Sequence, residues 1–385
     1  MKLKDIGKII TGNTPSKKND EYYSSKDILF IKPGDIEENY ITSLKNSEEY
    51  ISEKARGKAK ILPEGAVLVT CIGTIGKVGI LEKEATCNQQ INAIIPNNKV
   101  ISKYLAYLIQ SKQKILKLKA NAPVVPIINK KDFSEIEINI CNKDDQIKIV
   151  KQLDLLKKII DRRKKQIEEL DNIIKSQFVE MFGNPILNEF NWEKGLCKEL
   201  TSKIGSGATP DGGNKNYKET GISLIRSMNV YDGYFEYKDL AYIDEQQANK
   251  LKNVEIKAND ILFNITGASV TRTCIVPNDI LPARVNQHVS IIRCNEKINN
   301  IFLNYLLIND SFKSNLLNIA KAGGGTREAV TKNQIENFEI IIPPIELQNK
   351  FADFVKVIDK QKFEIEKSLK EMENLYNSLM DEYFG

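Results

Sequence analysis

Apolar residues recur at alternating steps of three and four in two long stretches of the chain, residues 144–183 and 344–385. This heptad spacing, sustained over more than four repeats, is typical of helices that pair in a coiled coil. The predicted seam of the first helix consists of Leu153, Leu156, Ile160, Ile167, Leu170 and Ile174. The predicted seam of the second consists of Val355, Ile358, Ile365, Leu369, Met372 and Tyr376.

Polar residues interrupt the two seams at different places. Arg163 stands where the second helix has Ile365, and Lys362 stands where the first has Ile160. Single polar seam residues often fix the register of a coiled coil. The alternative interpretation is a kink or a frayed stretch at these positions.

The two stretches are the ends of a duplicated unit, residues 1–183 and 184–385. Three groups of residues ahead of the helices recur in the same order, at offsets of 194 to 198. Thr11-Gly12-Asn13-Thr14-Pro15 recurs as Ser206-Gly207-Ala208-Thr209-Pro210, Val67–Gly73 recurs as Ile261–Gly267, and Asn88-Gln89-Gln90-Ile91 recurs as Asn286-Gln287-His288-Val289. From Lys130 onward the offset is constant at 202. A period near 200 residues indicates a duplicated domain, because solenoid repeats are far shorter.

Shorter elements are predicted in both copies by short apolar runs and by amphipathic spacing. The predicted strands are Val67–Ile72 with Ile261–Ile265, Ile91–Ile95 with Val289–Ile292, and Glu135–Ile140 with Asn337–Ile342. The predicted amphipathic helices are Tyr104–Ile115 and Phe302–Leu317.

The order of these elements predicts an α+β protein with four parts. Residues 1–143 and 184–343 form two mixed α/β domains, and residues 144–183 and 344–385 form the long helices. Because the first helix leads from one domain to the other, the two helices pair antiparallel, with a domain at each end and a pseudo-twofold axis from the duplication. Forty helical residues give a rod of roughly 60 Å.

Composition places the chain in the cytoplasm without a membrane segment. No apolar run approaches the roughly 20 residues that span a bilayer, and the first residues lack the apolar core of a signal peptide. The six cysteines, at positions 71, 87, 141, 197, 274 and 294, include no Cys-x-x-Cys pair. This pattern favours free thiols and predicts that Cys71, within a strand, is a core residue.

The charge is uneven along the chain. Residues 1–143 carry a net charge of +7, whereas residues 184–343 carry none and the two helices carry +1 and −3. A basic domain is compatible with contact to nucleic acid. A solvated, lysine-rich surface explains the charge equally well.

The motifs of catalysis are missing from the sequence, which predicts a protein that is not an enzyme. The chain has one histidine, His288, so a histidine triad or a histidine-based metal site is excluded. No phosphate-binding Gly-x-x-x-x-Gly-Lys loop occurs, and Gly323-Gly324-Gly325 lacks a following Lys-Ser/Thr. Asn184-Pro185 does not continue into the Asn-Pro-Pro-Tyr of adenine methyltransferases.

Basic and amide side chains in the predicted loops are candidates for reading DNA bases, because arginine and lysine bond guanine edges and asparagine and glutamine bond adenine edges. In the first domain the candidates are Lys17, Lys18, Lys32, Lys77, Asn88, Gln89 and Gln90. In the second they are Asn214, Lys215, Tyr217, Arg226, Thr271, Arg272, Arg284, Asn286, Gln287, His288 and Arg327. Each is singly also explained as a surface residue, and the recurring Asn-Gln pair as amides that cap a strand end. Five of the eight arginines lie in 184–343, which predicts that the second domain reads a guanine through arginine.

Taken together, these features resemble the specificity subunits of type I restriction-modification systems. The resemblance covers essentially the whole chain and rests on the order and duplication of its motifs. The most specific are Thr11–Pro15 and Ser206–Pro210, the glycine turns after Val67 and Ile261, Pro343-Pro344-Ile345-Glu346-Leu347-Gln348, and Met181-Phe182-Gly183-Asn184-Pro185. The helix entry Cys141–Gln146 departs from the pattern because it lacks the paired prolines; Asp144-Asp145 are suited to cap that helix instead.

The resemblance implies that each domain reads one half of a split, non-palindromic sequence in double-stranded DNA. It implies that the helices set the spacing and dock two adenine-N6 methyltransferase subunits, and through them restriction and translocase subunits. Cofactors would then sit on the partners, S-adenosylmethionine for methylation and ATP with magnesium for restriction, and none on this chain. Two alternatives stay open: the specificity subunit of a bipartite type II system, and a coiled-coil scaffold with two interaction domains that does not bind DNA.

Overall fold

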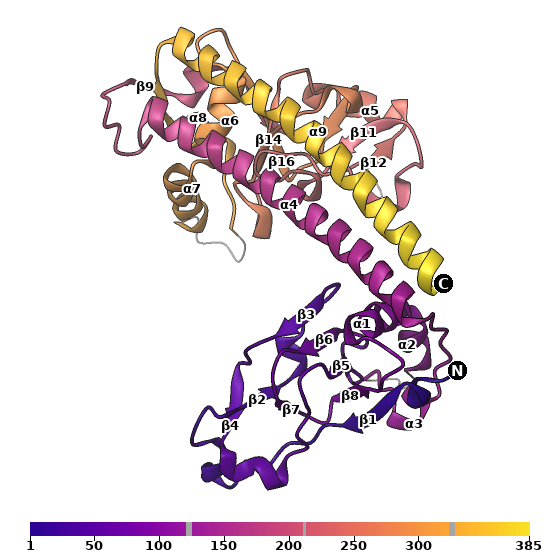
Figure 1. Cartoon of the computed structure of the whole chain (residues 1–385). Coiled ribbons are helices and arrows are strands. Elements are labelled where there is room, and N and C mark those ends of the chain that lie inside the picture. Colours follow the sequence, from indigo (N-terminus) through magenta and orange to yellow (C-terminus); the bar gives the residue numbers. More distant parts are fainter. Residues whose placement is uncertain (121–124, 211–212, 323–327) are drawn as a thin grey trace. The chain divides into compact units, whose positions relative to one another are not determined.

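The protein was analysed as a computed structural model, which describes residues 1–120, 125–210, 213–322 and 328–385. The chain divides into two compact units, and each unit contains parts of both long helices (Figure 1). Unit 1 consists of Met1–Lys164 and Lys367–Gly385, and unit 2 of Lys165–Glu366.

Two small sheets and three short helices form the globular part of unit 1. A mixed sheet has the order β1 (Gly7–Thr11), β8 (Ile91–Pro96), β5 (Val67–Thr70), β6 (Val78–Leu81) and β3 (Ile41–Leu44). The second sheet has the order β4 (Glu49–Ile51), β2 (Ile28–Ile31) and β7 (Ala85–Cys87). The helices are α1 (Ser102–Ser111), α2 (Gln113–Lys119) and α3 (Lys130–Ser134).

Unit 2 repeats this arrangement. Its larger sheet has the order β10 (Thr201–Ser206), β16 (Val289–Cys294), β13 (Ile261–Asn264) and β14 (Thr273–Ile275). A second sheet has the order β12 (Ala241–Ile243), β11 (Ile222–Ile225) and β15 (Ala283–Val285), and β17 (Glu339–Ile342) pairs with β9 (Glu193–Leu196). The helices are α5 (Glu245–Lys250), α6 (Asn300–Ile308), α7 (Asp310–Ala322) and α8 (Lys332–Glu336).

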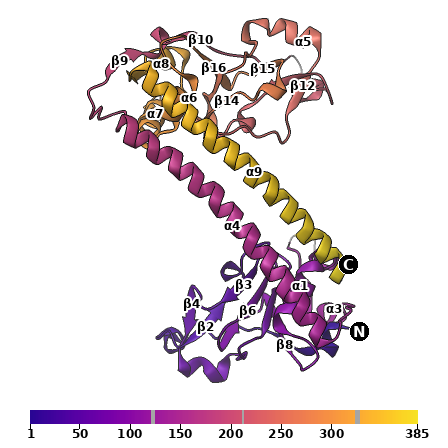
Figure 2. The same ribbon diagram turned by 45° about the horizontal axis from the view of Figure 1, so that its top comes forward.

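The long helices α4 (Lys143–Phe182) and α9 (Ile345–Phe384) run antiparallel, as their opposite courses in Figures 1 and 2 show. In unit 1, Lys164 of α4 pairs with Glu373 of α9 at 2.9 Å. In unit 2, Lys362 pairs with Asp171, which gives the predicted polar seam residue Lys362 a partner on the opposite helix. All twelve predicted seam residues are buried or half-buried. The mixed α/β fold with an antiparallel helix pair is therefore confirmed.

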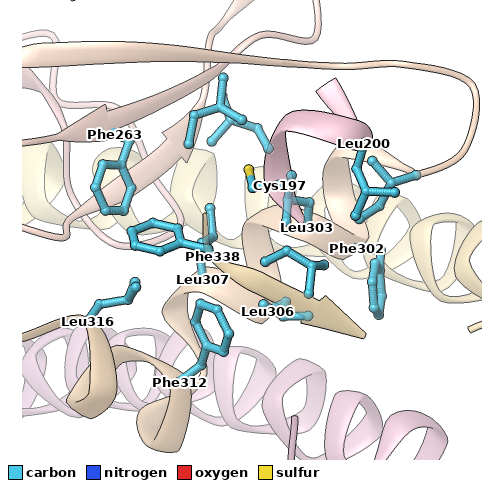
Figure 3. Close-up of a cluster of buried hydrophobic side chains, with 14 of the residues drawn as sticks. Cys197, Leu200, Phe263, Phe302, Leu303, Leu306, Leu307, Phe312, Leu316 and Phe338 are labelled. Atoms are coloured by element: carbon cyan, nitrogen blue, oxygen red, sulfur yellow. The ribbon is translucent and has the colours of Figure 1, made fainter. Parts of the chain in front are cut away.

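The helices also complete the cores of the globular parts. In unit 2, Phe178 and Phe182 from α4 pack with Phe302 from α6 and Phe351 from α9, with ring centroids 4.7–5.7 Å apart. Figure 3 shows Phe302 within the larger apolar cluster, which includes Phe263, Phe312 and Phe338. In unit 1 fewer aromatic rings pack at the corresponding place: Phe384 of α9 packs on Tyr104 with centroids 5.2 Å apart.

A buried glutamine fixes the first turn of each long helix. Gln146 donates to the carbonyls of Lys99 and Cys141 at 3.0 and 2.8 Å and accepts from the Ile101 amide at 3.0 Å. Gln348, 202 residues later, donates to the Pro343 carbonyl and accepts from the Asn299 amide, both at 2.8 Å. Both glutamines are fully buried, so these bonds satisfy polar groups that would otherwise be costly.

Two sequence predictions need correction. Each predicted amphipathic helix is a pair of helices, which meet at Lys112 in unit 1 and at Asn309 in unit 2. Asn309 has extended backbone, and its side chain accepts from the amides of Ser311 and Phe312, so it caps α7 and ends α6.

The second correction concerns the closing strand Glu135–Ile140, which is not a strand; only Lys2 and Glu137 form an isolated bridge. In unit 2 the equivalent strand β17 has a four-residue partner in β9, from a segment that precedes η5 (Cys197–Glu199). In unit 1 the segment facing Glu135–Ile140 is Met1–Leu3, where the Leu3 amide donates to the Ile136 carbonyl and the Met1 carbonyl accepts from the Ile138 amide.

The cysteines are free thiols, and Cys71 is a core residue as predicted. Burial raises the pKa of Cys71 and of Cys87 to about 12. The described helices include none that is long and apolar enough to cross a membrane.

Candidate nucleic-acid interface

Part of the residues singled out in the sequence lie at one edge of the sheets in each unit: Lys32, Lys77 and Asn88–Gln90 in unit 1, and Arg226, Thr271, Arg272 and Asn286–His288 in unit 2. In unit 1 this edge holds residues 12–15, 32–34, 71–77 and 88–90, because Thr11 pairs with Asn92, Thr70 with Ile91, and Ile31 with Cys87 at the same strand ends. In unit 2 it holds residues 207–210, 226–228, 265–272 and 286–288. We call these groups the loop edges of units 1 and 2.

The asparagine of the repeated Asn-Gln pair is structural in both units. Asn88 and Asn286 are buried, and their side chains accept from the amides of Gln90 and His288 at 3.1 and 3.0 Å. Their own amides bond to the last strand residues Ile31 and Ile225. The structure thus supports the strand-end interpretation for these two asparagines, whose side-chain oxygens are occupied by backbone amides.

The glutamine of the pair is exposed and tied to the other repeated motif. The Thr14 hydroxyl donates to Oε1 of Gln89 at 2.7 Å, and the Thr209 hydroxyl donates to Oε1 of Gln287 in the same way. Gln287 also contacts Nε2 of His288 at 3.3 Å. We call these threonine–glutamine pairs the loop clamps.

A glycine lets each clamped loop lie against the neighbouring strand. A Cβ at Gly12 would lie 2.3 Å from the carbonyl oxygens of Cys87 and Asn88, and one at Gly207 would lie 1.7 Å from the Val285 oxygen. The repeated Gly in the two motifs is therefore required by close backbone approach.

The lysines predicted as base readers in unit 1 differ in whether the fold already gives them a partner. Lys17 and Lys18 are exposed, whereas Lys32 forms an ion pair with Glu49 and lowers the pKa of that carboxyl by hydrogen bonding. Lys77 donates to the Pro33 carbonyl at 3.2 Å. Gln90 is half-buried and accepts from Asn88 at 2.9 Å.

The arginines of unit 2 are mostly occupied by the fold. Arg284 is buried, and its guanidinium donates to the carbonyls of Ala248 and Ala283 at 3.2 and 2.9 Å. We therefore withdraw Arg284 as a base reader. Arg226 donates to the Asp239 carbonyl and lies 5.5 Å from the Tyr217 ring centroid.

Arg272 is held differently. Its guanidinium carbon lies 4.5 Å from the centroid of Tyr231, which stacks on Tyr234 with centroids 5.0 Å apart and planes at 15°. The residue before it, Thr271, is fully buried and has a φ of 70°, an unfavourable backbone for a β-branched side chain. Burial raises the pKa of the Tyr234 phenol.

The remaining predicted residues are placed as follows. Lys215 is exposed, and His288 is half-buried with Nδ1 2.7 Å from the Thr266 hydroxyl. The side chain of Asn214 and the whole of Arg327 lie outside the described residues. Sequence reasoning missed Tyr231 and Tyr234; their only signal is two tyrosines that flank Asp232-Gly233, a turn with positive φ at the glycine.

The geometry of the loop edges offers binding groups. Among the described residues, no group of three or more His, Cys, Asp or Glu side chains could hold a metal ion. The loop edges present the exposed amides of Gln89 and Gln287 and half-buried cations such as Lys77 and Arg272 at strand ends, an arrangement suited to contacting bases and phosphates.

Comparison with known proteins agrees with this description. A family model described as "Type I restriction modification DNA specificity domain" matches residues 1–172 and 190–373. The type I restriction enzyme MjaIX specificity subunit of Methanocaldococcus jannaschii is 29% identical, over 94% of this chain and 88% of its own. The MjaVIII specificity subunit of the same organism is 25% identical, over 97% and 91%.

A solved structure shares the fold. The S subunit of a type I restriction-modification system from M. genitalium superposes with a TM-score of 0.60, covering all of this chain and 95% of that one, at 14% identity. The curated relatives are specificity subunits, which are recognition components and not catalysts.

Proposed function

The chain belongs to the family of type I restriction-modification DNA specificity domains, and we propose that it reads a two-part, non-palindromic target in double-stranded DNA. Each loop edge reads one half of the target. The observation that carries the proposal is the duplicated loop edge, in which one scaffold of clamp, glycine and buried asparagine presents different exposed side chains in the two units.

Partners dock, in this proposal, on the long helices. Four exposed apolar residues there form two pairs at the repeat offset of 202. Leu155 and Val357 are 59% and 57% exposed, and Ile173 and Leu375 are 46% and 44% exposed. The other exposed large apolar residues of these helices, Ile147, Val179 and Phe363, align with Asn349, Asp381 and Asp161.

The matched residues lie on the free flank of the helix pair. In unit 1, the domain packs on the flank of Asp154, which accepts from Tyr107 at 2.6 Å, and of Lys157, which lies 3.8 Å from the Tyr40 centroid. Heptad position places Leu155 and Leu375 on the opposite flank. Val357 and Ile173 hold the same positions in unit 2, so two copies of one partner would meet equivalent surfaces. We propose that these copies are the adenine-N6 methyltransferase subunits.

The partners supply the chemistry in this proposal. They hold S-adenosylmethionine, and further restriction subunits, bound through them, use ATP and magnesium. This chain holds no cofactor and contributes sequence recognition alone.

Mapping of methylated bases in cells that express the chain with its partner subunits tests the proposal. We expect methylated adenines within one bipartite motif, and their loss when this gene alone is deleted. DNA binding by the purified complex should fall steeply with salt, since phosphate contacts release counterions. A non-DNA scaffold predicts neither result. Methylation and cleavage by one fused partner polypeptide would favour the bipartite type II alternative.

The spacer between the half-sites is expected to follow helix length. One helical turn added after Lys164 in α4 and before Lys367 in α9, where the chain passes from one unit to the other, should change the spacer and leave both half-site sequences intact. An unchanged spacer in the mapped motif would show that the helices do not set it. A matched variant with four substituted, not inserted, surface residues at the same place controls for altered helix sequence.

A further inference from the structure

Arg272 is distinguished from the other described arginines of unit 2 by what surrounds its guanidinium. Arg226 and Arg284 donate to backbone carbonyls, and Arg293 makes two 2.7 Å bonds to the carboxylate of Asp260. Within the described part of the chain, the recorded side-chain contact of Arg272 is the Tyr231 ring face. A ring satisfies none of the five N–H donors of a guanidinium, so these donors remain for a ligand.

The backbone that carries Arg272 is fixed. The Arg272 carbonyl accepts from the Asn264 amide at 2.8 Å, and the Arg272 amide donates to Ser269 at 3.2 Å. Thr271 donates to the Asn264 carbonyl at 2.8 Å while holding its φ of 70°. Backbone strain of this kind persists only where the surroundings enforce it, and it concentrates at binding sites.

The ring stack is fixed as well. Tyr231 and Tyr234 belong to a tight turn in which the Tyr231 amide donates to the Tyr234 carbonyl at 3.1 Å and the Gly233 amide donates to the Thr273 carbonyl at 2.9 Å. The Arg272 guanidinium carbon lies 4.5 Å from the Tyr231 centroid, so the ring helps to position the cation. Tyr234 at the other end of the stack is 54% exposed.

The charges around the stack are mixed. Asp232, within the turn, forms an ion pair with Lys313, and Glu236 follows the turn. Among the described residues neither carboxylate forms an ion pair with Arg272. The salt dependence of binding therefore separates a base contact from a phosphate contact.

We infer that Arg272, positioned by the Tyr231–Tyr234 stack, reads a guanine in the half-site of unit 2 through paired hydrogen bonds to O6 and N7. Arginine in this geometry is the commonest specific contact in the major groove. The inference rests on the proposed function and names one base type and one residue within it. Lys77, the aligned residue of unit 1, bonds to Pro33 and has no such stack.

Methylated-base mapping with four variants in the complete system tests the inference. Arg272→Gln and Arg272→Lys remove the two-pronged donor, and the second keeps the charge. Tyr231→Leu removes the stack, whereas Tyr231→Phe keeps it. Lys297→Gln removes one exposed charge after β16, at the opposite end of that strand from the loop edge, and is the matched control.

We expect both arginine variants to lose preference for guanine at one position of one half-site by about tenfold to a hundredfold. The other half-site should be unchanged. Tyr231→Leu should lose part of this preference, and Tyr231→Phe and Lys297→Gln none. Co-purification with the partner subunits and an unchanged melting temperature establish that each variant is folded.

Two results would overturn the inference. The first is an unchanged motif in both arginine variants. The second is a uniform loss of affinity, restored by Arg272→Lys and accompanied by a smaller salt dependence, which marks a phosphate contact. Failure of the wild-type complex to methylate any bipartite motif would count instead against the proposed function, so the two failures are distinguishable.

Discussion

The loop edges of units 1 and 2 share their scaffold and differ at their tips. Both keep a buried asparagine, a threonine–glutamine clamp and a glycine in close contact with a strand. At the tips, the Gly76 amide donates to Thr70 and the Thr271 amide donates to the equivalent Asn264, with φ of 85° and 70°, so Lys77 is the counterpart of Arg272. Duplication has therefore preserved the parts that shape the loops, while the groups that can meet DNA have changed.

The cores under these edges differ too. In unit 2, the end of α4 and the start of α9 pack together through a group of four phenylalanine rings. In unit 1, the end of α9 packs through Phe384 on Tyr104. The buried glutamines Gln146 and Gln348 are the same in both. The helix start is thus fixed alike in the two units, and the packing of the helix end is unit-specific.

Removal of one ring tests this difference with the largest expected effect. Phe182→Ala should lower the free energy of unfolding by about 3–5 kcal/mol, because Phe182 is fully buried among three other rings. Phe384→Ala, with fewer ring neighbours, should cost less. Urea denaturation measures both, with Phe363→Ala, 64% exposed, as the control. Equal losses for the two buried rings would contradict the comparison of the cores.

A methyl group at the shared glycine tests the shared scaffold. Gly207→Ala should destabilise the protein by roughly 1–3 kcal/mol, because its Cβ would meet the Val285 carbonyl at 1.7 Å. Gly12→Ala should cost a similar amount. Gly205→Ala, two residues from Gly207 and with open space around its Cβ, is the matched control and should be tolerated. Tolerance of alanine at Gly207 would mean that the close approach is dispensable.

The features of the fold that could be predicted are those whose pattern can be read directly along the sequence. The heptads predicted α4 and α9, and the repeated motifs predicted the duplicated domain, because periodicity and duplication can be read along the chain. Helix breaks at Lys112 and Asn309 carry no proline or glycine, so spacing alone did not show them.

The roles of the polar candidates were not predictable, since the same residue types serve fold and binding. Asn286 and Gln287 are neighbours, yet one is buried and the other exposed. Arg284 has a side chain of the type that bonds guanine edges, but its guanidinium is buried and donates to the Ala248 carbonyl. The Tyr231–Arg272 stack joins residues 41 positions apart, a contact that only the folded chain reveals.

The matched helix residues give a test with an intermediate effect. Leu155→Glu should weaken binding of one of the two partner copies by about tenfold, the loss of roughly 1.4 kcal/mol, and leave unfolding nearly unchanged because the side chain is exposed. Leu155→Glu with Val357→Glu should weaken both. Native mass spectrometry of the complex counts the copies. The unmatched, exposed residues provide the control pair Ile147→Glu and Phe363→Glu. A greater loss from the control pair would place the docking surface elsewhere.

The loop clamps should give the smallest effect and sharpen the comparison most. Thr14→Val and Thr209→Val each remove one hydroxyl that donates to an exposed glutamine, so each should cost only about 0.5–1 kcal/mol. Thr14→Ser and Thr209→Ser keep the donor and are the matched controls. Because the clamp is common to both units, the two valine variants should lose stability equally, whereas each should loosen base preference only in the half-site of its own unit. A stability loss confined to Thr209→Val would mean that the clamp belongs with the unit-specific tips and not with the scaffold, since Gln287, unlike Gln89, also contacts a histidine.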